Sequence, residues 1–146
     1  MASVGGLSDI PVVTTEGIAP DAGVTPAVQA LLTELAESLE AFRRTGNTHV
    51  IDLRSLPIRL EEHALLRDWL GVGEVTVEID SLGLTSIHET AYPGIWWVIH
   101  RNREGEIMTQ QVEVTRCPAL IHSQPEDIDE AAARLRAALT HTGEMP

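Results

Sequence analysis

The chain has 146 residues and a formal net charge of −12 at neutral pH. That length is enough for one domain with a real hydrophobic core, and such negative charge argues against binding to the phosphate backbone of nucleic acids. Cys117 is the only cysteine, which excludes an internal disulfide and any multi-cysteine zinc or iron–sulfur site built by this chain alone. The sequence therefore predicts a cytoplasmic protein without a cofactor.

The first residues differ from the rest in composition. Residues 1–24 mix Gly, Pro, Asp and Thr around a short apolar run, which predicts a flexible N-terminal arm. They have neither the basic region nor the apolar region of an export signal, and no apolar run in the sequence is long enough to cross a bilayer. We therefore expect one globular domain over residues 25–146, with no export signal and no membrane span.

The first half of this domain reads as helix, strand and helix. Thr25 and Pro26 are typical of a helix start, and the apolar residues after them share one helical face to about residue 46. A short buried strand is expected at residues 49–53. A second helix is expected from about Leu60 to Leu70, where two nearby glycines end it.

After residue 73 the apolar period changes to two, which is the period of a strand. The expected strands cover residues 75–80, 84–90, 95–101 and 106–114. A final helix begins at the capping box Ser123-Gln124-Pro125-Glu126. These elements predict an α+β domain, a mainly antiparallel sheet of about four to five strands with three helices packed on one face.

Trp96 and Trp97 are adjacent on a predicted strand and must point to opposite faces of the sheet. A hairpin loop over residues 102–105 places Trp97 on the mostly apolar face, which assigns it to the core and leaves Trp96 partly exposed. The expected pairs are Ile99 with Met108, Trp97 with Gln110, Ile95 with Val112, Trp96 with Gln111, Val98 with Thr109 and His100 with Ile107. A loop of three or five residues would reverse the two faces.

An open sheet face with an exposed tryptophan indicates a protein–protein contact, because monomers tend not to leave such apolar patches bare. The expected partner-binding residues are Glu89, Trp96, Val98, His100, Ile107 and Gln111. This surface should bind a client protein or close a homodimer. Trp96→Ala is then expected to destabilise the fold less than Trp97→Ala, and Trp96→Glu to abolish association while the fold stays intact.

Catalytic and metal-binding patterns are weak. His88 and Glu89 alternate faces on a regular strand, so they do not bind one metal together. The segment Gly71-Val72-Gly73 follows a helix and precedes a strand, the reverse of the order in a dinucleotide site. Neighbouring carboxylates such as Glu61-Glu62 lie in first helical turns, where the helix dipole explains them. The sequence therefore predicts no enzyme and no metal site.

Four segments together carry a family resemblance. They are His49–Pro57, Leu65–Val75, Glu89-Thr90 with Pro93–Val98, and the closing helix with Glu126-Asp127-Ile128. These segments resemble the C-terminal conserved region of the HupH/HyaF family of hydrogenase expression/formation proteins. The resemblance implies an accessory protein needed to make active NiFe hydrogenase, linked to maturation of the iron–sulfur small subunit before twin-arginine export.

Two functions are compatible with this resemblance. The first is an assembly chaperone without catalysis, which contacts the small subunit or its precursor and other maturation proteins. The second is a metal or iron–sulfur delivery protein that uses His88, His100 or Cys117. For the first function, the carboxylates expected near Trp96 are Glu78, Glu89 and Glu113, and they would suit the arginines of a twin-arginine signal peptide.

Overall fold

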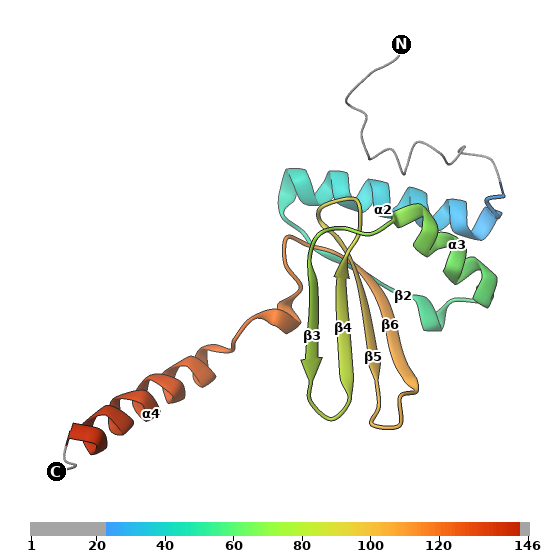
Figure 1. Cartoon of the computed structure of the whole chain (residues 1–146). Helices are drawn as coiled ribbons and strands as arrows, with labels where there is room; N and C mark the ends of the chain where they lie inside the picture. The colour runs from blue at the N-terminus through green and yellow to red at the C-terminus, as the bar shows by residue number, and fades with distance from the viewer. Residues whose placement is uncertain (1–22, 144–146) are drawn as a thin grey trace. The chain divides into compact units, whose positions relative to one another are not determined.

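The computed structural model describes residues 23–143, so almost all of the expected arm over residues 1–24 lies outside the described residues. The helices are α2 (Pro26–Thr45), α3 (Leu60–Leu70) and α4 (Pro125–Gly143), and short 3-10 turns cover Leu53–Ser55 and Ala119–Ile121. The strands are β2 (His49–Asp52), β3 (Thr76–Asp80), β4 (Leu84–Glu89), β5 (Ile95–Arg101) and β6 (Ile107–Val114) (Figure 1). The chain divides into two compact units between Arg116 and Cys117. The expected single domain over residues 25–146 stays a prediction.

The first unit contains one five-stranded sheet in the order β2-β6-β5-β4-β3, and every neighbouring pair is antiparallel. Figure 1 shows β3, β4, β5 and β6 side by side in this sheet. Strands β2 and β3 form its two edges. The α+β class and the antiparallel sheet expected from the sequence are confirmed.

Helices α2 and α3 pack on one face of the sheet, called here the helix face. Val28, Leu31 and Leu35 of α2 and Leu66 and Leu70 of α3 are buried in one core cluster. The sheet contributes Ile51, Ile95, Trp97, Ile99, Val112 and Val114 to the same cluster. Trp97 is only 2% exposed, so its assignment to the core is confirmed.

The β5–β6 hairpin reaches these faces by an unexpected register. Its loop covers residues 102–106, an odd number that by itself would reverse the two faces. A β-bulge beside the loop leaves Met108 as an extra residue in β6, and this second shift returns the side chains of β6 to their expected faces. The pairs around the bulge are His100 with Thr109 and Arg101 with Ile107.

The expected strand pairs of this hairpin are therefore wrong by two residues. Trp97 pairs with Val112 instead of Gln110, and Trp96 pairs with Glu113 instead of Gln111. The physical reason is that the loop is one residue longer than expected and the bulge adds a second extra residue, Met108, both before the regularly paired part of β6. A shift of two residues keeps each side chain on its expected face.

The second face, called here the outer face, carries the alternate residues of the strands. Its members are Val50 and Asp52 of β2, Val77 and Ile79 of β3, Thr85, Ile87 and Glu89 of β4, Trp96, Val98 and His100 of β5, and Thr109, Gln111 and Glu113 of β6. Trp96 is 6% exposed and Val98 is 5% exposed, so the expected exposure of Trp96 is wrong. The Trp96 indole Nε1 donates a hydrogen bond to the Thr115 carbonyl at 3.0 Å, which ties the ring to the chain after β6.

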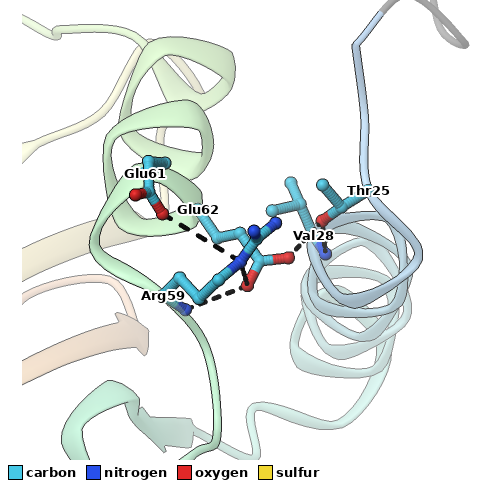
Figure 2. A network of polar contacts seen from close by, with 5 residues as sticks. All are labelled: Thr25, Val28, Arg59, Glu61 and Glu62. Atoms are coloured by element: carbon cyan, nitrogen blue, oxygen red, sulfur yellow. Dashed lines mark hydrogen bonds and ion pairs between the residues drawn. The ribbon is translucent and has the colours of Figure 1, made fainter.

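Helices α2 and α3 are joined at their N-termini by a polar network (Figure 2). Thr25, the N-cap of α2, accepts a hydrogen bond from the Val28 backbone N–H at 3.2 Å and donates its hydroxyl to the Glu62 carboxylate at 2.6 Å. The other Glu62 oxygen accepts the Arg59 backbone N–H at 2.9 Å, and the Arg59 guanidinium lies 3.6 Å away. The Thr25 hydroxyl and then the Arg59 backbone N–H hold the pKa of the buried Glu62 carboxyl below its ordinary value of 4.5.

A lowered carboxyl pKa stabilises the fold only when the group is ionised. We therefore expect the stability difference between wild type and Glu62→Gln to be largest above pH 4.5 and to shrink as the pH falls through the lower folded-state pKa. Denaturant unfolding between pH 3 and pH 7 measures this. The matched control is Glu61→Gln, because Glu61 is exposed and only 4.0 Å from the same Arg59 guanidinium. Equal pH profiles for the two variants would contradict the role of Glu62.

The second unit contains α4, which begins with Pro125 at its first position and Glu126 and Asp127 in its first turn. Its apolar residues recur at helical spacing and so share one side of the helix. They include Ile128, Ala132, Leu135 and Leu139. The expected packing of this stripe on the sheet stays a prediction. Within residues 23–143, no helix has the length and hydropathy needed to span a membrane.

Candidate functional site

Five of the six residues predicted to contact a partner lie together on the outer face. Glu89 pairs with Trp96 and Val98 pairs with Gln111, and His100 follows two residues after Val98 on the same strand. The sixth residue, Ile107, is on the helix face, where it packs against the core. Its expected place on the outer face is wrong, because the five-residue loop pairs Ile107 with Arg101 instead of His100.

Burial reduces the part of the outer face that a partner could touch. Trp96, Val98 and Ile87 are buried, and they form an apolar band in the middle of the sheet. The half-buried members are Glu89, His100, Gln111 and Glu113, and the exposed members include Val50, Asp52 and Thr109. The accessible surface is therefore mostly polar and acidic, with Val50 as an exposed apolar residue at the β2 edge.

Glu113 is the carboxylate of the outer face whose burial most favours binding of a positively charged partner. It pairs with Trp96 across β5 and β6, and it also pairs with Val50 of β2. Burial raises the pKa of its carboxyl above the ordinary value of 4.5. No cation lies within ion-pair distance of Glu113 in the described part of the chain. A positive charge from outside would remove part of the cost of its burial.

Two other polar groups of the outer face are already engaged. The His100 Nδ1 atom lies 2.8 Å from the Thr85 hydroxyl. The Glu89 carboxylate accepts the Glu74 backbone N–H at 3.2 Å. Glu113, by contrast, has no side-chain hydrogen bond or ion pair among the described residues, and it is the charged group of this face whose burial is uncompensated.

A small cavity on the helix face was not expected from the sequence. A cavity of about 280 Å³ lies between the C-terminal end of α3 and the end of β4, and we call it the Arg67 pocket. Its lining residues are Arg67, Gly71, Val72, His88, Glu89, Thr90 and Trp97. The pairing of His88 with Trp97 on neighbouring strands places both side chains on the helix face. This pairing is the sequence feature that could have indicated the pocket.

A second cavity explains why glycine follows Pro93 in the turn between β4 and β5. Pro93 and Gly94 line an apolar groove of about 570 Å³ together with Leu39 and Phe42 of α2. Gly94 has a φ of +101°, and a Cβ atom there would meet the Leu39 Cδ1 atom at 3.0 Å. The turn between β4 and β5 therefore needs glycine in order to approach α2.

The histidines do not form a shared metal site. His88 is on the helix face and His100 is on the outer face, so the sheet separates their rings. The residues that the structure describes include no group of three His, Cys, Asp or Glu side chains that could hold a metal ion. The outer face instead carries a half-buried carboxylate, Glu113, without an ion pair among the described residues.

An antiparallel sheet with two helices on one face and an acidic second face defines an α+β domain whose candidate site is a contact surface. A family model described as "HupH hydrogenase expression protein, C-terminal conserved region" matches residues 26–142. This chain belongs to that family.

Relatives and a solved structure agree with the match. The chain is 38% identical over 107 residues to hydrogenase expression/formation protein HupQ of Azotobacter chroococcum mcd 1, an alignment covering 70% of this chain and 38% of that protein. It is 30% identical to HoxQ of Cupriavidus necator over 88% of this chain and 45% of that protein. The structure of hydrogenase expression protein HupH from Thiobacillus denitrificans matches with a TM-score of 0.76 and 38% identity, over 80% of this chain and 98% of that one. The chain thus spans less than half the length of these two curated relatives.

Proposed function

We propose that the chain is a non-catalytic accessory protein of NiFe hydrogenase maturation, which contacts the iron–sulfur small subunit or its precursor. Membership of a family of hydrogenase expression proteins supports the maturation role. The observation that carries the contact is Glu113, a half-buried carboxylate on the outer face without a cation among the described residues.

The chemistry of the outer face favours a basic client segment. Asp52, Glu89 and Glu113 come from three different strands and place negative charge around the buried Trp96. Arginine binds carboxylates through two parallel hydrogen bonds, and the attraction is larger where water is partly excluded. A twin-arginine signal peptide on the small-subunit precursor carries such arginines, so the precursor is the client that this face fits.

The test is the affinity of the chain for the small-subunit precursor in a salt series. We expect binding to weaken as salt is added, because screening acts on charge pairs that remain partly exposed. We expect Glu113→Gln to bind about tenfold more weakly at low salt, since a charge-assisted hydrogen bond contributes about 1.5–3 kcal/mol. Burial disfavours the charge at this position, so the variant should be at least as stable as wild type.

The matched control is Glu104→Gln in the exposed β5–β6 loop, which removes the same charge away from the outer face. Its affinity should stay close to that of wild type. Equal affinities for Glu113→Gln and wild type, without salt dependence, would contradict an acidic docking face. Equal affinities for the precursor and for the small subunit without its signal peptide would show that the mature subunit is the client.

A further inference from the structure

The Arg67 pocket lies mainly on the helix face, whereas the proposed client surface is the outer face, and Glu89 at the end of β4 belongs to both. Its walls come from the last turn of α3, from Gly71 and Val72, which follow α3, and from the end of β4. Trp97 of β5 forms its inner side. At about 280 Å³ the pocket lies just below the range of about 300–1,000 Å³ of small-molecule sites, so its volume suits a small ligand.

Backbone hydrogen bonds hold these walls together. The Ala91 N–H donates to the Leu70 carbonyl at 2.8 Å, and the Gly73 N–H donates to the Glu89 carbonyl at 2.8 Å. A Cβ atom on Gly73 would lie 2.4 Å from the Thr90 carbonyl oxygen, so this close approach requires glycine. The pocket is therefore a preformed feature of the fold rather than a gap between loose side chains.

Two residues that line this pocket, the exposed Arg67 and the buried Trp97, carry hydrogen-bond donors that have no acceptor among the described residues. The Arg67 guanidinium lies over the Trp97 ring, 5.2 Å from its centroid, and no carboxylate lies within ion-pair distance of it in the described part of the chain. The Trp97 indole N–H is buried and has no acceptor. Such an unsatisfied buried donor is uncommon and costs free energy. The Glu89 carboxylate, by contrast, is engaged with the Glu74 N–H.

The His88 imidazole completes the donor set. Its strand partner is Trp97, and it lines the pocket beside Arg67. Burial, and then the nearby Arg67 charge, lower the pKa of His88 below its ordinary value of 6.5, while Glu78 acts in the opposite direction and Arg101 in the same one. The Thr76 hydroxyl is 3.5 Å from its Nδ1 atom.

We propose that the Arg67 pocket binds a carboxylate, with the guanidinium of Arg67, the indole N–H of Trp97 and the imidazole of His88 as its donors. A guanidinium matches the two oxygens of a carboxylate, and the Trp97 ring holds it in place by cation–π contact. A singly charged ligand also suits an acidic protein better than a phosphate, because Glu78 and Glu89 lie close to the same donors. The carboxylate is either a free small acid or the C-terminus of a polypeptide.

The indole N–H resonances of Trp96 and Trp97 provide the test. We would titrate ¹⁵N-labelled protein with acetate, with N-acetyl-diglycine and with N-acetyl-diglycinamide, at constant ionic strength set by chloride. The Trp97 resonance should shift to saturation with the two carboxylates and not with the amide. The Trp96 resonance should not move, because its N–H is already bonded to the Thr115 carbonyl and belongs to the outer face.

Two variants assign the effect to the pocket. Arg67→Gln should weaken carboxylate binding at least tenfold, and Arg103→Gln, an exposed loop guanidinium, should not change it. A carboxylate next to His88 favours the imidazolium, so binding to wild type should tighten as the pH falls from 7.5 to 6.

The relative affinities for acetate and for N-acetyl-diglycine distinguish the two possible sources of the carboxylate. Equal affinity for acetate and N-acetyl-diglycine assigns the pocket to a free small acid, and at least tenfold tighter binding of the peptide assigns it to a chain terminus. The proposal is overturned if neither carboxylate shifts the Trp97 resonance to saturation, or if Arg67→Gln binds as wild type does. The Trp97 resonance reports only on the pocket, so a negative result would not contradict the proposed binding of the client through Glu113.

Discussion

Trp97→Ala is expected to lower the free energy of unfolding by about 3–5 kcal/mol, the cost of truncating a large aromatic side chain inside a packed core. Trp97 is 2% exposed and shares its cluster with residues from both helices and three strands. The truncation would leave a cavity between α3 and the sheet and remove the ring beneath the Arg67 guanidinium. Urea unfolding followed by circular dichroism measures the change.

Trp97→Phe is the matched control for this variant. It keeps an aromatic ring in the core and removes the indole N–H that lacks an acceptor, so its cost should be clearly smaller. A loss below about 1 kcal/mol for Trp97→Ala would contradict the central position of this side chain in the core.

Trp96→Glu is expected to prevent folding or to destabilise the chain by more than about 4 kcal/mol. The substitution would place a carboxylate at a site that is 6% exposed, with Glu89 and Glu113 as its partners on the neighbouring strands. It would also remove the hydrogen bond to the Thr115 carbonyl. This outcome replaces the expectation from the sequence that the variant would lose only its partner.

Trp96→Phe keeps the apolar contacts and loses only that hydrogen bond, so it serves as the control. Thermal unfolding followed by far-ultraviolet circular dichroism separates the two variants. A folded Trp96→Glu variant with nearly wild-type stability would show that the outer face is open at Trp96. Glu113→Gln is the better probe of association, because it changes the charge without disturbing the apolar band.

The order and type of the elements could be predicted because each carries a strong local signal. The Thr25 cap, the Pro26 start and the Gly46 end of α2 are all observed, with Gly46 in the left-handed conformation. The assignment of Trp97 to the core also agrees with the structure. It rested on an assumed loop of even length, and it holds only because the bulge at Met108 compensates for an odd one.

Long-range packing explains what the sequence could not reveal. Trp96 is buried and bonded to the carbonyl of Thr115, which lies beyond the end of β6, and neither feature has a local signature in the sequence. The Arg67 pocket likewise joins α3, β4 and β5, which are separate in the sequence. Of the three carboxylates expected near Trp96, Glu113 and Glu89 pair with it, whereas Glu78 pairs with Ser86 on the helix face, because the register of β3 is set by long-range pairing.

The edge strand β3 affects how copies of this protein meet. Among the described residues, one side of β3 has no neighbouring strand, and its exposed residues include Glu78 and Asp80. If two copies paired through this edge in antiparallel fashion, carboxylates would face carboxylates across the new ladder, and like charges placed directly opposite destabilise a sheet. The acidic edge therefore discourages the stacking of copies into continuous sheets and favours separate chains even at high protein concentration.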